Sequence, residues 1–289
     1  EDLKYQEDYD FWLRFTDKFN VQNINLPLMY YRKHGKSMSG NQEPRLEARR
    51  YVKAKIVEKR KVEKPTVLAV IPARSAPFAR FDVNCKKLRG KPVIYYTIKE
   101  AKASEMIDRT VVSTENSEVA KMAEKMGGEV PFLRPTPLAM QGVHVKEVLK
   151  DTLIRLYKEE RYEPDLVVTL QVNSPFRTAE HIDEAVNTQL IHNTDSVISV
   201  YEDLSFHWRP GENGLKPVIY TERMLRKEKE IVYRENAAVY LYRAKNLLMG
   251  VGMGECIGHI EMSEKDSFRV MSELDLWMAE KLMERDGAA

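Results

Sequence analysis

Cysteine and histidine are scarce in this sequence. Its 289 residues include only the cysteines Cys85 and Cys256 and six scattered histidines, with no His-x-x-x-His pair. These spacings argue against a clustered zinc centre and against a scaffold built on disulfides. We therefore expect reduced thiols and a cytoplasmic protein.

Long apolar runs and an excess of one charge are also missing. No apolar stretch approaches the roughly 18–20 residues of a membrane helix, so we predict no membrane span. The net charge of +2 gives no electrostatic reason to expect a nucleic-acid partner. The 43% apolar content is ordinary for a globular protein, and a chain of this length can bury a substantial core.

Apolar strands and amphipathic helices alternate from residue 66 onward. The first strand, Val67–Ile71, is followed by a loop and then by Gly90-Lys91-Pro92, which opens a helix. The pattern predicts further strands at 109–113, 129–133, 165–171, 195–201 and 237–242. Repeated βα units with right-handed crossovers predict a three-layer α/β/α Rossmann-like domain with a mostly parallel sheet over residues 66–289.

Residues 1–64 show a different pattern. Phe11, Phe15 and Phe19 fall at helical spacing, residues 21–31 alternate as an extended segment, and residues 43–64 are charged and helix-prone. We expect an N-terminal helix-strand-helix appendage that ends in a solvated linker helix, with the domain boundary at Pro65.

Part of this appendage is similar to a known family. The segment from Glu7-Asp8 to Arg14, with Pro27–His34 and Ser37–Ser39, resembles the C-terminal end of an inverting GT-A glycosyltransferase domain over residues 1–45. In that family the acidic pair supplies the catalytic base. The preceding two-thirds of such a domain is not in this sequence, which begins without Met. We expect either an excerpt from a longer glycosyltransferase fusion or a remnant that packs without chemistry.

A second resemblance covers residues 66–285. Five segments match in order. The first three are Ile71-Pro72-Ala73-Arg74-Ser75 with Gly90-Lys91-Pro92, Val112-Ser113-Thr114, and Phe132-Leu133-Arg134-Pro135 with Leu138-Ala139. The last two are Leu170-Gln171-Val172-Asn173-Ser174-Pro175-Phe176-Arg177-Thr178 and Tyr233-Arg234-Glu235-Asn236-Ala237-Ala238-Val239-Tyr240. Their ordered combination resembles the cytidylyltransferase family, closest to the acylneuraminate (CMP-nonulosonate) synthetases. The resemblance implies a Rossmann-like nucleotidyltransferase fold and transfer of CMP from CTP to an acidic sugar, with release of pyrophosphate.

The same resemblance implies roles for individual residues. Arg74 and Asn84 are the catalytic candidates. The nucleotide-binding candidates are Arg74, Ser75, Asn84, Arg134, Gln171, Ser174 and Arg177, and the sugar-binding candidates are Gln171, Tyr233, Asn236 and Tyr240. Cationic and backbone groups that stabilise phosphates, with Mg²⁺, are what this chemistry requires. For each candidate, a structural role such as a turn or a buried strand position is the alternative.

The chain departs from the family pattern at two places. In the first loop, Pro77-Phe78-Ala79 occupies a small and basic stretch, and Val83 replaces a lysine. Near the C-terminus the family has Asp-x-Asp-x-x-x-Asp, where Arg269, Met271 and Asp275 stand here. Arginine and methionine are not ligands of Mg²⁺. Asp266 and Asp275 remain as candidate metal ligands, although Asp275 is also placed to favour a helix N-terminus.

Two hypotheses follow from the matches to the family pattern and the departures from it. The first is a cytidylyltransferase that activates a nonulosonate sugar with CTP and Mg²⁺ for surface polysaccharide synthesis. The alternative is a catalytically inactive homologue that acts as a nucleotide- or sugar-binding, or assembly, module fused to a glycosyltransferase. Members of the resembled family often pair through the segment before Asn236, so we expect a homodimer.

Overall fold

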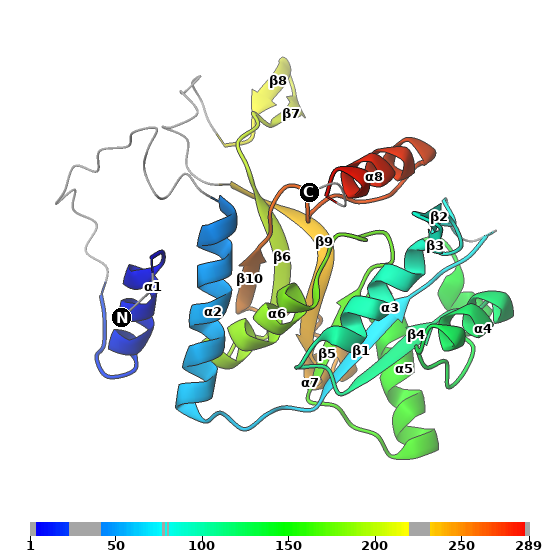
Figure 1. Cartoon of the computed structure of the whole chain (residues 1–289), viewed down its shortest axis with the longest axis horizontal. Helices are drawn as coiled ribbons and strands as arrows, with labels where there is room; N and C mark the ends of the chain where they lie inside the picture. The colour runs from blue at the N-terminus through cyan, green and yellow to red at the C-terminus, as the bar shows by residue number, and fades with distance from the viewer. Residues whose placement is uncertain (1–3, 23–41, 77–78, 80, 220–231, 287–289) are drawn as a thin grey trace.

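A central sheet of six strands organises the molecule (Figure 1). The computed structural model describes residues 4–22, 42–76, 79, 81–219 and 232–286. The strand order is β10-β6-β9-β5-β1-β4. The strands are β1 (Val67–Pro72), β4 (Arg109–Ser113), β5 (Leu166–Leu170), β6 (Ser196–Asp203), β9 (Val232–Arg243) and β10 (Ile257–Glu261). Two short pairs lie outside it, β2 (Lys87–Leu88) with β3 (Lys91–Pro92) and β7 (Trp208–Gly211) with β8 (Gly214–Pro217).

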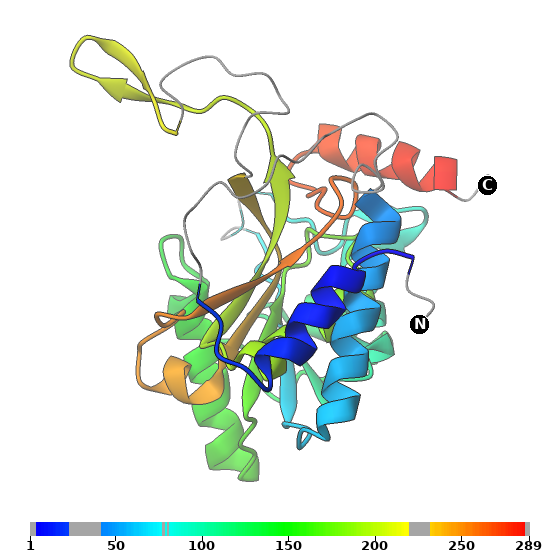
Figure 2. The ribbon, with the colours of Figure 1, turned by 90° about the vertical axis from the view of Figure 1, so that its left-hand side faces the viewer.

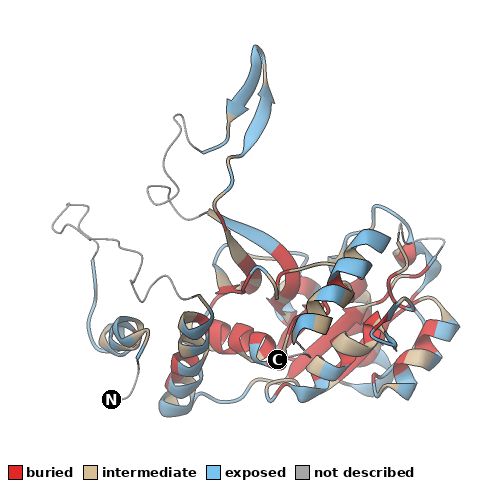
Figure 3. Cartoon of the chain, turned by 45° about the horizontal axis from the view of Figure 1, so that its top comes forward, coloured by how far each residue is buried: buried red, intermediate tan, exposed pale blue. Residues whose placement is uncertain are grey.

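Helices cover both faces of the sheet, because alternate residues of its buried strands point to opposite sides. On one face, Val67, Ala69 and Ile71 pack with α3 (Val93–Ala103), α4 (Ser117–Lys125), α6 (Ala179–His192) and α8 (Glu273–Asp286). On the other, Leu68 and Val70 pack with α5 (Val145–Glu160) and α7 (Ala244–Leu248). The predicted three-layer α/β/α fold is confirmed, and the sheet is its most buried part (Figure 3).

One strand runs against the parallel pattern. β1 pairs in parallel with β4 and β5, and β10 with β6, but β9 is antiparallel to both β5 and β6. The register of β6 and β9 shifts between Ile198 and Val200, and Ala237 has a φ of 58°. A non-glycine residue in the left-handed region marks a local kink in β9. The strand predicted at 129–133 was wrong, since Val111 and Glu129 form only an isolated bridge.

The N-terminal helices pack onto the α6 side of the sheet (Figure 2). Helix α2 (Gln42–Arg60) contacts α6, and α1 (Glu7–Thr16) contacts α2. Leu13, Val52 and Ile56 are the buried centre of this contact. Glu7 and Asp8 lie in the exposed first turn of α1, whereas the predicted segment 27–39 falls outside the described residues.

Among the residues that the structure describes, no helix is long and apolar enough to cross a membrane.

Candidate nucleotide site

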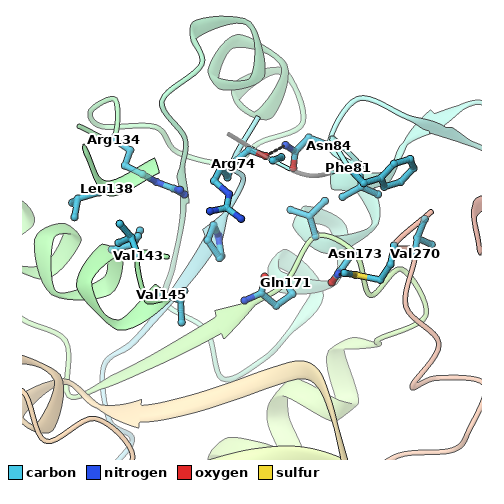
Figure 4. Close-up of a pocket in the computed structure, with 16 residues that line it drawn as sticks. Arg74, Phe81, Asn84, Arg134, Leu138, Val143, Val145, Gln171, Asn173 and Val270 are labelled. Carbon is cyan, nitrogen blue, oxygen red and sulfur yellow. Dashed lines mark hydrogen bonds between the residues drawn. The ribbon is translucent and has the colours of Figure 1, made fainter. Parts of the chain in front are cut away.

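A cavity of about 320 Å³ opens at the carboxyl ends of β1 and β5 (Figure 4). This edge is where α/β sheets place their ligands. The cavity is lined by residues of the first loop, of the segment around the short 3₁₀ helix Thr136–Ala139, of α5, and of the chain before α8: Pro72, Arg74, Ala79, Phe81, Val83, Asn84, Arg134, Leu138, Val143, Val145, Val148, Gln171, Val172, Asn173, Val270 and Met271.

Among the described residues, Arg74 and Arg134 are the cations that line this cavity. Their guanidinium groups both point into it, from the loop after β1 and from the segment before the 3₁₀ helix (Figure 4). Arg74 Nη1 donates to the carbonyl of Met140 at 3.3 Å. Arg134 Nε donates to Ser113 Oγ at 3.1 Å, and its Nη2 donates to the Ser113 carbonyl. Two cations in one cavity make a site for a multiply charged anion.

The protonation of Arg134 depends on its surroundings. Burial is the main reason why the pKa of Arg134 falls to about 10; nearby Glu115 opposes this shift and Arg74 adds to it. Arg134 therefore stays protonated near neutral pH. Glu115 Oε2 lies 3.9 Å from Arg134 Nη1, which is too long for a hydrogen bond. The positive charge of the pair is only partly compensated.

A hydrogen-bond network holds the first loop. Asn84 is buried, and its Nδ2 donates to the Arg74 carbonyl at 2.9 Å and to Asp82 Oδ1 at 3.0 Å. The backbone N–H of Ser75 donates to Glu115 Oε1 at 2.7 Å. Ser75 and Asn84 thus support the loop that carries Arg74. Glu115 is not among the residues predicted from the sequence, although its position two residues after β4, at the same sheet edge, was an available signal.

Three predicted nucleotide contacts follow β5, and the structure separates them. Gln171 lines the cavity. Arg177 is 1% exposed and lies behind it, where Nη1 donates to the carbonyls of Gln171 at 3.1 Å and Ala238 at 2.9 Å. Burial lowers the pKa of Arg177 to about 9. Ser174 is also buried, and its hydroxyl has no partner among the described residues. Neither residue lines the cavity described here.

The predicted sugar contacts on β9 lie apart from this cavity. Asn236 is 1% exposed and is bonded within the core, where its Nδ2 donates to Ser267 Oγ at 2.8 Å and its Oδ1 accepts from Ser199. The Tyr240 hydroxyl donates to Glu235, and burial is the main reason why its pKa is raised. Tyr233 is 39% exposed, with its ring 4.9 Å from that of His259. The backbone kink at Ala237 lies next to Asn236, whose side chain points into the core.

The residues of the cavity do not fit a resident Mg²⁺. Asn173 Nδ2 donates to Met271 Sδ at 2.7 Å, so an amide and a thioether stand where hard oxygen ligands are needed. Asp275 Oδ2 instead accepts from the Met271 N–H and the Ser272 hydroxyl, both at 2.9 Å, at the start of α8. Asp266 bonds to Ser263 and faces His181 at 3.7 Å. Within the described part of the chain, no group of three or more His, Cys, Asp or Glu residues is placed to hold a metal.

The structure describes part of the first loop, where the sequence departs from the family pattern. Val83 is buried and lines the cavity, so this position presents an apolar side chain. Phe81 lines it as well, with Lys86 Nζ 5.6 Å from its ring centroid. Phe78 lies outside the described residues. The cavity therefore combines two arginines with apolar walls.

Comparison with known proteins shows a family for most of this chain. A family model described as cytidylyltransferase matches residues 68–285. The CMP-N,N'-diacetyllegionaminic acid synthase of Legionella pneumophila is 30% identical over 225 residues, which cover 75% of this chain and 96% of the relative. The N-acylneuraminate cytidylyltransferase of Escherichia coli is 36% identical over 135 residues, which cover 46% of this chain and 31% of the relative.

Solved structures share the fold. The CMP:2-keto-3-deoxy-manno-octonic acid synthetase complexed with CTP superposes with a TM-score of 0.57 at 15% identity, over 76% of this chain and 99% of that chain. The 4-diphosphocytidyl-2C-methyl-D-erythritol synthase of Anaerococcus prevotii superposes with a TM-score of 0.56 at 13% identity, over 76% and 97%. At these identities the likeness concerns the arrangement of the chain alone.

Proposed function

This chain belongs to the cytidylyltransferase family, and we propose that it transfers CMP from CTP to a nonulosonate sugar, with release of pyrophosphate. The paired guanidinium groups of Arg74 and Arg134 are the observation that carries the proposal. They enter one cavity at the carboxyl edge of the sheet, where a triphosphate is attracted by both.

The chemistry assigns the arginines a role in binding and in the transition state. A sugar hydroxyl attacks the α-phosphorus of CTP, an O–P bond forms, the bond from that phosphorus to the β-phosphate oxygen breaks, and the hydroxyl proton is released. Negative charge on the phosphates is stabilised by preorganised cations. Asn84 and Glu115 hold the loop of Arg74, and Gln171 offers amide groups to the bound substrates.

The sugar is proposed from the relatives. One relative is named for N,N'-diacetyllegionaminic acid and another for N-acylneuraminate, and both of these are acidic sugars. Enzymes of this reaction class generally work with Mg²⁺, so the assay contains it. The comparisons give no support to the catalytically inactive alternative.

We also propose that the protein acts in the cytoplasm as a homodimer. Cys85 and Cys256 are free thiols, in keeping with a reducing compartment. The β7–β8 hairpin projects from the body of the molecule (Figures 1 and 2) and carries exposed Trp208 and Leu215. Such side chains on a projecting arm are suited to a protein contact. Light scattering of the wild type and of Trp208→Ser tests this, and a monomeric wild type contradicts it.

The deciding experiment measures pyrophosphate release from CTP and Mg²⁺ with N,N'-diacetyllegionaminic acid, N-acetylneuraminic acid and 2-keto-3-deoxy-manno-octonic acid. We expect turnover with at least one of them. Arg74→Ala is expected to weaken CTP binding at least about tenfold, because a charged hydrogen bond to phosphate contributes roughly 1.5–3 kcal/mol.

Arg14→Ala is the matched control. Arg14 is an exposed arginine on α1 that pairs with Asp10 at 2.9 Å and does not line the cavity. Its removal is expected to leave CTP binding unchanged. No turnover with any of the sugars, or equal CTP binding by Arg74→Ala and wild type, contradicts the proposal.

A further inference from the structure

One wall of the cavity is built from two segments that are distant in sequence. The Val270 N–H donates to the Asn173 carbonyl at 2.8 Å, which joins the chain after β5 to the chain before α8. Asn173 and Met271 then meet through the contact of amide and sulfur at 2.7 Å. Both line the cavity that Arg74 and Arg134 enter (Figure 4).

This wall is unsuited to a divalent cation. Mg²⁺ is bound in proteins through one or two carboxylates together with waters and substrate phosphates. The wall offers Asn173 Oδ1, a neutral oxygen that is buried and has no partner among the described residues, beside a soft thioether.

The carboxylates close to the cavity have other partners. Asp82 accepts from Asn84 Nδ2 and from the Ala76 N–H, at 3.0 and 3.1 Å. Glu115 accepts from the Ser75 N–H, and Asp275 accepts at the start of α8. Recruiting Asp82 or Asp275 to a metal would therefore compete with contacts that stabilise the first loop and the start of α8. Glu115 Oε2 has no hydrogen-bond partner among the described residues, but it faces the positive charge of Arg134, whose Nη1 is 3.9 Å away.

We propose that this chain binds the triphosphate of CTP through its arginines without a metal ion held by protein carboxylates, so that its affinity for CTP does not depend on a divalent cation. The inference rests on the proposed function for the identity of the nucleotide. Arg74 and Arg134 supply the positive charge, and free CTP, which carries more negative charge than its magnesium complex, is attracted by them at least as strongly.

Calorimetric titration of the full chain with CTP tests this, once with MgCl₂ and once with EDTA. We expect the Kd in EDTA to be equal to or tighter than the Kd in Mg²⁺, or weaker by no more than about threefold. A Kd that weakens more than this in EDTA overturns the inference.

Substitutions at the wall provide the complementary test. Met271→Asp adds a carboxylate that repels free CTP and binds Mg²⁺, so its Kd is expected to be at least about tenfold tighter in Mg²⁺ than in EDTA. Asn173→Asp is the second variant, in case the first does not fold. Met271→Leu, which keeps the apolar volume, is the matched control and is expected to remain insensitive to Mg²⁺. Aspartate variants that fold and show no such dependence contradict the assignment of this wall.

The two proposals fail in different ways. Tight CTP binding in both buffers without pyrophosphate release overturns the proposed function and leaves this inference standing. Turnover together with binding that requires Mg²⁺ overturns this inference alone. A lack of CTP binding in both buffers overturns both.

Discussion

Two groups of cationic side chains in this molecule differ in their partners. At the cavity, Arg74 and Arg134 bond to carbonyls and a hydroxyl, and the nearest carboxylate contact of Arg134 is 3.9 Å away. On α2, Lys53 Nζ lies 2.7 Å from Glu184 Oε1 on α6 and is 1% exposed. Arg45 forms a two-pronged pair with Glu261 on β10, at 2.5 and 3.2 Å.

The contrast lies in how completely each charge is neutralised. Lys53 and Arg45 on α2 are matched by carboxylates of the elements they pack against, so these ion pairs hold the helix on the sheet and have little capacity left for a ligand. At the cavity the positive charge is only partly compensated, because Glu115 Oε2 lies 3.9 Å from Arg134 Nη1 and Arg74 bonds to the neutral Met140 carbonyl. We expect an anionic substrate to complete this compensation. We expect cations of the first kind to contribute to stability and those of the second kind to contribute to ligand binding.

Lys53→Met tests how much the buried Lys53–Glu184 pair contributes to stability, and it is expected to have the largest effect. Removal of one partner leaves Glu184 buried and uncompensated, so the free energy of unfolding is expected to fall by about 3–5 kcal/mol. Urea unfolding measures it, and CTP binding of the folded variant is expected to be unchanged. The double variant Lys53→Met/Glu184→Leu is the control and should recover most of the loss. A loss below about 1 kcal/mol would show that the pair contributes little.

His181 gives the α2 contact a dependence on pH. It faces Arg50 at 3.4 Å and Asp266 at 3.7 Å, and its Nδ1 accepts from the Thr178 N–H at 3.1 Å. Burial is the main reason why its pKa is lowered to about 3, and the charges of Arg50 and Arg177 add to this while Glu180 opposes it.

Because the pKa of His181 is depressed in the folded state, its contribution to stability is present above the unfolded pKa of about 6.5 and is lost as the pH falls from there toward 3. In the wild type, protonation of this histidine lowers the free energy of unfolding by roughly 2 kcal/mol between pH 7 and pH 5. In His181→Gln this part of the decrease is expected to be absent. Equal differences in both proteins would exclude this role.

Glu115→Gln tests how the charge beside Arg134 affects CTP binding. The amide oxygen still accepts from the Ser75 N–H, but the negative charge beside Arg134 is lost. The cavity becomes more positive, so CTP is expected to bind about three- to fivefold more tightly, a change of roughly 1 kcal/mol. Glu118→Gln, an exposed position on α4, is the control. Weaker binding by Glu115→Gln would mean that the carboxylate positions the arginine rather than only opposing its charge.

Asp275→Ala is expected to have the smallest effect. Asp275 and Ser272 bond reciprocally at the start of α8, since the Asp275 N–H donates to Ser272 Oγ at 3.2 Å. Loss of such a cap costs about 0.5–1 kcal/mol of stability. Thermal unfolding measures it, and the Kd for CTP in Mg²⁺ is expected to be unchanged. CTP binding that this substitution weakens in Mg²⁺ but not in EDTA would return Asp275 to the candidate metal ligands.

The sequence predicted the sheet better than the directions of the side chains at its edge. The apolar runs of β1 and β5 predict buried strands because a buried strand tolerates few polar residues, and the cavity does lie at their carboxyl ends. Arg177 and Asn236 looked equally suited to a ligand. Their side chains turn inward, to the Ala238 carbonyl and to Ser267, which a linear pattern does not reveal.

By itself, the sequence determined the alternation of strands and helices, the family resemblance and the absence of aspartate at positions 269 and 271, since these follow from local patterns and residue identity. Only the tertiary structure decided which charges are neutralised. Folding brings Glu184 Oε1 to 2.7 Å from Lys53 Nζ, whereas Glu115 Oε2 stays 3.9 Å from Arg134 Nη1, so the charge of Arg134 is less completely neutralised. The energy of an ion pair depends on the distance between its two charges, and here the paired residues are far apart in the chain.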